Sequence, residues 1–118
     1  MALTNARIEF LNHINGREVL CAIIQSGDEY SQSVSKFYLT TGWTKEEWDE
    51  FLSGLNFDYD SRYGGQELFG TIWYVDGTWS ERGEYDGSEW WEHHVCPDIP
   101  TELNRLDKVR EKKLNQIL

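Results

Sequence analysis

Three ionisable side chains, Glu81, Glu92 and His94, have the clearest capacity for chemistry in this sequence. If the Asp-Gly pairs at 76–77 and 86–87 each form a two-residue hairpin turn, Glu81 lies opposite Glu92 and His94 lies diagonally beside Glu81. Two carboxylates and an imidazole could bind a divalent metal ion. They could also act as general acid and base, because crowding raises one pKa of a carboxylate pair. Alternatively, these side chains have no functional role and simply extend into water from a twisted sheet edge.

The sequence favours the absence of a metal or cofactor. Adjacent His93 and His94 point to opposite faces of a strand, so only His94 and Cys96 could share a site. A zinc site needs further ligands, such as Cys21 and a carboxylate, whereas a reduced, packed cysteine needs none. No CxxC, HExxH, GxSxG or glycine-rich phosphate motif is present. The alternative metal site would comprise His94, Cys96, Glu81 and Glu92.

A three-stranded antiparallel meander must position these residues. Strands are predicted over 68–75, 78–85 and 88–95, because aromatic and β-branched residues alternate between two Asp-Gly turn signals. Two-residue turns would place Trp79 opposite Tyr74 and Trp90 opposite Gly83. They would also put Tyr74 on the same face as Trp79 and Trp90.

A second carboxylate pair, Glu84 with Glu89, is predicted on the opposite face. Like charges directly opposite one another destabilise a ladder by a few tenths to about 1 kcal/mol. Arg82 lies diagonally beside this pair and faces Trp91, so it can neutralise the pair and stack on the indole. Arg82 can therefore offset the repulsion between these two carboxylates.

The remaining elements complete an α+β fold in one domain, residues 1–118. Helices are predicted near 4–15, 44–54 and 101–118, the second on a Thr44–Glu47 capping box. Further strands of the antiparallel sheet are predicted near 18–25, 34–40 and 56–60.

Charge points to the class of partner. The 118 residues carry 21 Asp/Glu and 11 Lys/Arg, a net charge of −10. Residues 45–98 have a net charge of −11, whereas residues 101–118 have a net charge of +2. Direct nucleic-acid binding and anionic membranes are disfavoured, because both require a basic face. A basic protein partner is favoured, although the acidity could serve solubility alone. No apolar run approaches the length of a membrane helix and no signal peptide is recognised, so a cytoplasmic location is expected.

Residues 70–91, GTIWYVDGTWSERGEYDGSEWW, resemble small acidic, tryptophan-rich accessory proteins of tailed bacteriophages. The resemblance implies a role in host interaction or in countering host defence. Such proteins bind and inhibit a host enzyme, in some cases by imitating the charge of DNA.

The predicted function is therefore non-enzymatic binding of a basic or nucleic-acid-binding host protein by a monomer or homodimer. Six tryptophans in one small chain favour this interpretation, because exposed Trp beside polar residues is typical of interaction hot spots. The predicted contact residues are Glu81, Glu84, Glu89, Trp91, Glu92, Asp58, Tyr59 and Asp60. Two alternatives remain: a small enzyme or metal-binding module that uses Glu81, Glu92 and His94, and an oligomeric structural protein that pairs through its C-terminal helix.

Overall fold

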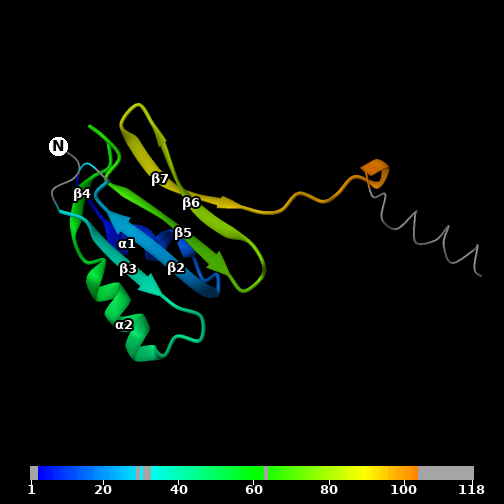
Figure 1. Cartoon of the computed structure of the whole chain (residues 1–118), viewed down its shortest axis with the longest axis horizontal. Coiled ribbons are helices and arrows are strands. Elements are labelled where there is room, and N and C mark those ends of the chain that lie inside the picture. Colours follow the sequence, from blue (N-terminus) through cyan, green and yellow to red (C-terminus); the bar gives the residue numbers. More distant parts are fainter. Residues whose placement is uncertain (1–2, 29, 31–32, 63, 104–118) are drawn as a thin grey trace, which may run out of the picture.

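The computed structural model describes residues 3–28, 30, 33–62 and 64–103 (Figure 1). The elements in chain order are β1 (Leu3–Asn5), α1 (Ala6–Ile14), β2 (Val19–Ser26), β3 (Ser35–Leu39), α2 (Lys45–Gly54), β4 (Asp58–Asp60), β5 (Leu68–Tyr74), β6 (Trp79–Tyr85), β7 (Ser88–His94) and a single 3₁₀ turn (Thr101–Leu103). The predicted α+β class with an antiparallel sheet is confirmed.

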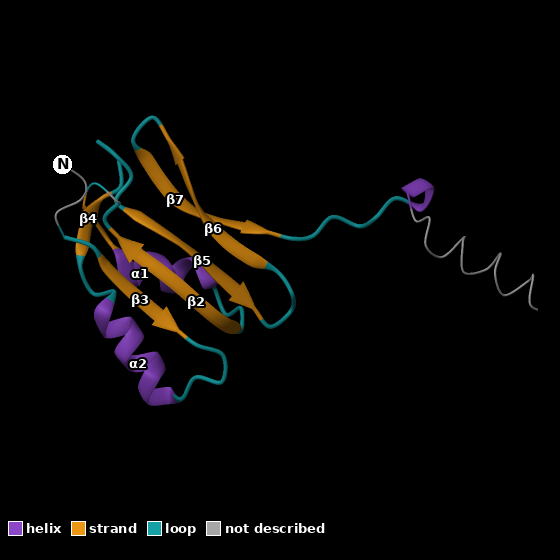
Figure 2. Ribbon diagram, viewed as in Figure 1, coloured by secondary structure: helices purple, strands orange, loops and turns teal. Residues whose placement is uncertain are grey.

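The main sheet has five antiparallel strands in the order β3-β2-β5-β6-β7 (Figure 2). Both helices pack against the same face of this sheet, which we call the inner face; the opposite face is the outer face. The predicted strand at 56–60 does not join the main sheet. Instead β4 pairs with β1 in a separate two-stranded sheet, with Thr4 opposite Tyr59.

The core lies between the inner face and the two helices. Phe10 of α1 meets Trp48 and Phe51 of α2, with ring centroids 6.0 and 5.5 Å apart. The sheet contributes apolar residues from four strands to this cluster: Val19, Ala22, Ile24, Leu39, Ile72, Tyr74 and Trp91. Burial of these side chains is the main driving force that holds the helices on the sheet.

Local sequence signals set both helix boundaries. Asn5 caps α1 by accepting a hydrogen bond from the Ile8 N–H, and the helix ends at Asn15 in the left-handed conformation. Thr44 and Glu47 form the predicted capping box at the start of α2. The second helix was therefore predicted closely, whereas the first begins later than expected because residues 3–5 form β1.

The β5–β6 hairpin differs from its prediction by one residue. Trp79 lies opposite Trp73, not Tyr74. The loop contains three residues, since Tyr74 N–H bonds the Thr78 carbonyl, and of the Asp-Gly pair only Gly77 has a positive φ. This geometry is typical of a type I turn followed by a bulge. Asp76 stabilises it by accepting a hydrogen bond from the Thr78 N–H.

The β6–β7 hairpin has the predicted register. Asp86 and Gly87 both have positive φ, as a type I′ turn requires, and Gly83 lies opposite Trp90. The register of β5 against β6 therefore differs from the prediction by one residue, whereas the register of β6 against β7 matches it. Tyr74 is on the inner face, whereas Trp79 and Trp90 are on the outer face, because a shift of one residue inverts side-chain orientation.

Beyond β7 the chain runs away from the sheet through residues 95–100 to the 3₁₀ turn at Thr101–Leu103 (Figure 1). The rest of the helix predicted near 101–118 lies outside the described residues. In the part of the chain that the structure describes, no helix is long and apolar enough to span a membrane.

Candidate functional site

The outer face of the main sheet carries aromatic and acidic side chains that neither helix covers. Its middle row crosses all five strands as Tyr38, Ile23, Thr71, Glu81 and Glu92. A neighbouring row consists of Cys21, Trp73, Trp79 and His94. Trp73 is 42% exposed and Trp90 is 37% exposed, which is unusual for such large apolar side chains. This surface is therefore the strongest candidate for a binding site.

Two Trp-x-Glu units form the centre of the outer face. The Trp79 indole N–H donates to Oε1 of Glu81 at 2.9 Å, and the Trp90 indole N–H donates to Oε1 of Glu92 at 2.8 Å. Each pair lies two residues apart on one strand, so both members share a face. Since Glu81 and Glu92 are directly opposed, the two units bring two carboxylates together between two indoles. We call these four residues the Glu81–Glu92 cluster.

Among the described residues, His94 is the one side chain that forms an ion pair with the Glu81–Glu92 cluster. Its Nε2 is 3.6 Å from Oε2 of Glu92, and its ring stacks on Trp79 with centroids 5.7 Å apart. Within residues 3–28, 30, 33–62 and 64–103, no group of three or more His, Cys, Asp or Glu side chains could hold a metal ion. The Cys96 thiol is exposed and donates to the Pro97 carbonyl at 3.8 Å.

Gly83 makes room for the second indole. A Cβ atom placed on Gly83 would lie 2.7 Å from Trp90 Nε1 and 2.6 Å from Glu92 Oε1. The glycine therefore lets Trp90 and Glu92 fold down onto the sheet, where they can form their hydrogen bond.

The inner side of the same hairpin has a buried ionic network centred on Arg82. The guanidinium contacts Glu89 Oε1 at 2.6 Å and Glu9 Oε1 at 3.0 Å, and it lies 5.1 Å from the centre of the Trp91 ring. The Arg82 side chain is 2% exposed and that of Glu89 is fully buried. Glu89 also accepts the backbone N–H groups of residues 67 and 68. The Glu89 carboxylate therefore stabilises the fold and is not accessible to a partner.

Electrostatics within the network favours the charged guanidinium. Burial alone lowers the pKa of Arg82, but the Glu9 carboxylate, the Tyr59 phenol and hydrogen bonds to Glu89 and Tyr59 outweigh this effect, so the pKa is raised. Burial raises the pKa of Tyr59, and the hydrogen bond that its hydroxyl donates to Glu9 raises it further. Arg82 is therefore charged at neutral pH, and the Tyr59 phenol beside it is neutral.

The structure divides the residues predicted to contact a partner. Glu81 and Glu92 lie together on the outer face, whereas Glu89, Trp91 and Tyr59 are 5–7% exposed and belong to the inner network. The other three are on the surface but apart from the cluster. Glu84 accepts the Gly87 N–H, Asp58 accepts from Asn5, and Asp60 accepts the Arg62 N–H. The sequence analysis did not single out Glu9, whose partners are 50 and 73 residues away along the chain.

A second polar group on the inner face connects α1 to the hairpin. His13 Nε2 is 2.7 Å from the hydroxyl of Ser80, which also contacts the Tyr74 hydroxyl at 2.7 Å. Burial, together with the positive charges of Arg17, His93 and Arg82, lowers the pKa of His13 to about 4. Ser80 is completely buried, so this arrangement cannot present a nucleophile to a substrate.

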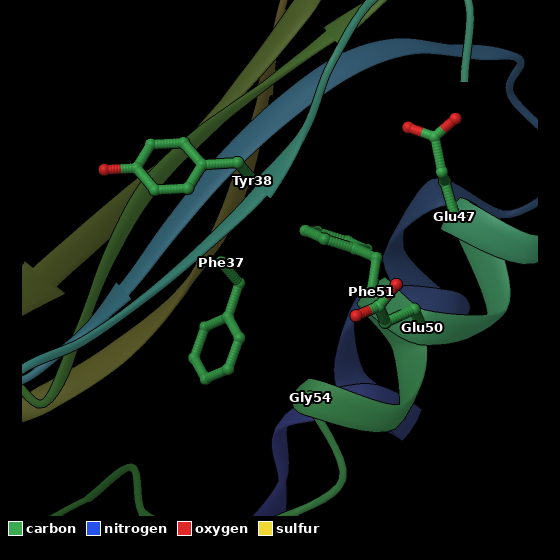
Figure 3. Close-up of a pocket in the computed structure, with 6 residues that line it drawn as sticks. All are labelled: Phe37, Tyr38, Glu47, Glu50, Phe51 and Gly54. Atoms are coloured by element: carbon green, nitrogen blue, oxygen red, sulfur yellow. The ribbon is translucent and has the colours of Figure 1, made fainter. Parts of the chain in front are cut away.

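A groove of about 380 Å³ lies between β3 and α2 (Figure 3). Phe37 and Phe51 point into it, Glu47 and Glu50 line the helix side, and Tyr38 points away. Glu47 is already committed to the capping box. The sequence analysis did not predict this groove, because it depends on how the edge strand β3 packs against α2, the next element in the chain, and no local sequence pattern marks that packing.

The comparisons with known proteins give no relative: no family model, no curated protein and no solved structure matches this chain.

Proposed function

We propose that this chain is a non-enzymatic binding module whose outer sheet face takes a basic segment of a partner protein. The Glu81–Glu92 cluster carries the proposal. Its two carboxylates face each other across the ladder, and no described Lys or Arg forms an ion pair with either of them. A cation from a partner would relieve the repulsion between them.

The cluster suits a guanidinium group better than an ammonium group. Arginine can donate parallel hydrogen bonds to carboxylates while its planar face stacks on an indole. Trp79 and Trp90 flank the two carboxylates and are held by the indole hydrogen bonds at 2.9 and 2.8 Å. A stacked cation contributes about 0.5–2 kcal/mol, and pre-ordering of the indoles reduces the entropy that binding costs.

The strong net negative charge supports the same class of partner. With a net charge of −10, the chain would attract basic proteins over a distance and repel nucleic acids. A nucleic-acid-binding host enzyme is the most specific version of this partner, and the acidic face would then occupy the groove that normally holds phosphates. In that version, duplex DNA added in excess displaces the chain from its partner.

Calorimetric titration with an octa-arginine peptide tests the proposal. Wild-type protein should bind the peptide, and Glu81→Gln/Glu92→Gln should weaken binding at least tenfold, about 1.4 kcal/mol, because both carboxylates lose their charge. Affinity should fall as salt is raised. An octa-lysine peptide should bind more weakly than octa-arginine.

The matched control is Glu46→Gln/Glu50→Gln, which removes the same charge from α2, where both side chains are exposed. This variant should bind the peptide nearly as wild type does. Equal losses in the two double variants would mean that net charge alone attracts the peptide, and the proposed site would be wrong. Loss in the α2 variant only would move the site to the groove beside β3.

A further inference from the structure

We infer that the outer face also receives the basic C-terminal segment, residues 104–118, of a second copy of this chain. The inference rests on the proposed function, since it requires that the outer face takes basic polypeptide. Here the partner is the chain itself, and segment exchange would regulate access of any other partner to the same surface.

The composition of the segment complements the outer face. Residues 104–118 contain five Lys/Arg and two Asp/Glu, a net charge of +3, whereas the rest of the chain has a net charge of −13. Five aliphatic residues accompany the basic ones: Leu106, Val109, Leu114, Ile117 and Leu118. The segment therefore combines cations for Glu81 and Glu92 with apolar side chains for the exposed indoles.

None of the described helices forms a second layer over the aromatic outer face. Trp73 and Trp90 of the main sheet are exposed, and so is Tyr38 at 60%. In the part of the chain that the structure describes, both helices pack on the inner face. A sheet face with large apolar side chains gains stability when a second layer covers it. The segment could form such a layer, since its basic residues match the carboxylates and its aliphatic residues match the indoles.

The path of the chain favours a second copy over the chain's own sheet. Residues 95–103 leave the end of β7 and lead away from the main sheet (Figure 2). Val95, Ile99 and Leu103 along this path are 59–70% exposed, so the described path does not fold back onto its own body. The described chain thus reaches Leu103 at a distance from its own outer face. Reciprocal exchange between two copies would use identical contacts and close as a two-fold dimer.

Charge exchange in the full-length chain tests this inference by sedimentation velocity. In the face variant, Glu81→Lys/Glu92→Lys reverses the acidic cluster. In the tail variant, Lys108→Glu/Lys112→Glu/Lys113→Glu reverses the basic segment. Wild type should reach twice the 13.9 kDa of one chain as concentration rises, and each variant alone should remain at 13.9 kDa. An equimolar mixture of the two variants should recover the dimer, because each acidic surface then meets a basic one.

Circular dichroism of each variant establishes that it is folded, and Glu46→Lys/Glu50→Lys on α2 is the matched control, which should still dimerise. Wild type that stays at 13.9 kDa up to the millimolar range would overturn the inference. So would a mixture that remains monomeric, or dimer loss in the α2 control alone, which would place the segment in the groove.

Failure of this inference can be told apart from failure of the proposed function. In the tail variant, the loss of octa-arginine affinity that Glu81→Gln/Glu92→Gln causes reports on the acidic face, because the glutamates introduced into residues 104–118 are present in both proteins compared. Binding of the peptide together with monomeric wild type would leave the proposed function in place and overturn the segment exchange. If the protein neither binds the peptide nor dimerises, the proposed function and the segment exchange are both wrong.

Discussion

The two faces of the β6–β7 hairpin use the same residue types in opposite ways. Glu89 and Trp91 on the inner face are buried beside Arg82, whereas Trp90 and Glu92 on the outer face are partly exposed. These four residues are consecutive in the sequence. The environment that the rest of the chain provides, and not residue type, decides which carboxylate stabilises the fold and which is available to a partner.

The difference arises from what the helices supply to each face. On the inner side, α1 brings Glu9 and His13 against the hairpin, and Arg82 compensates the buried Glu89. On the outer side, Glu81 and Glu92 accept one indole N–H each and still face each other. The inner charges are therefore compensated within the molecule, and the outer ones are open to compensation from outside it.

The largest expected effect comes from Glu89→Ala. Removal of this carboxylate leaves the buried Arg82 without its closest ionic partner and two backbone N–H groups without their acceptor. The free energy of unfolding should fall by about 3–5 kcal/mol. Glu92→Ala on the outer face should change it by less than about 0.5 kcal/mol. Urea denaturation followed by circular dichroism measures both; similar losses would contradict the comparison.

The tryptophans should show a similar contrast. Trp91→Ala removes a buried ring that stacks with His13 and lies over Arg82, and we expect a loss of about 3 kcal/mol. Trp90→Ala should cost less than about 1 kcal/mol, because its indole is on the surface, yet it should weaken octa-arginine binding. If Trp90→Ala destabilised the fold as much as Trp91→Ala, the outer face would not be a free surface.

Acid should weaken the inner face through His13. Its pKa is about 4 in the folded chain and 6.5 without the fold, so the unfolded state takes up the proton first as pH falls. The contribution of neutral His13 to the free energy of unfolding is therefore fully present above pH 6.5 and is lost as the pH falls from 6.5 to 4. We expect a loss of roughly 2 kcal/mol, less than the full shift because the imidazole is partly accessible to water.

The control for this prediction is His13→Gln, which should lose less stability than wild type over the same pH range. His93 also has a pKa lowered by burial, so some decline should persist in the variant. Denaturation curves at several pH values provide the measurement. Parallel declines in the two proteins would show that His13 does not carry the effect.

The smallest effect on stability with a measurable effect on binding is expected for Gly83→Ala. The added methyl group would displace the ends of the Trp90 and Glu92 side chains, both of which can move into solvent. Unfolding free energy should change by less than about 1 kcal/mol, while octa-arginine affinity should fall several-fold. Unchanged affinity would mean that the ordered indole–carboxylate pair does not contribute to binding.

Short-range signals explain which parts of the fold the sequence could predict. The capping box at Thr44 and the Asp86-Gly87 turn act within a few residues, and both were predicted correctly. The Asp76-Gly77 pair failed as a register marker, because Asp-Gly also suits a three-residue loop once Asp76 accepts the Thr78 N–H. Because the loop has one more residue than predicted, the side chains of β5 point to the face of the sheet opposite to the one predicted from their pairing with β6.

The candidate site was predictable only in part, because burial depends on residues far apart in the sequence. The opposition of Glu81 and Glu92 followed from the turn, as did the contact of Arg82 with Glu89 and Trp91. What was not predictable is that Glu9 would complete a buried network around Arg82. No local pattern marks that residue, so the inner carboxylate was assigned to the surface along with the outer ones.

Indole N–H signals in a ¹⁵N NMR titration with octa-arginine test the central claim most directly, because the six tryptophans report from different places. Trp79 and Trp90 donate to Glu81 and Glu92, whereas the Trp43 indole donates to the Val19 carbonyl. Single Trp→Phe variants assign the signals. The account predicts that the Trp79 and Trp90 signals shift in a saturable way while those of Trp43 and Trp91 stay in place. Shifts confined to Trp43 and to Trp48 of α2, or no saturable shift at all, would contradict it.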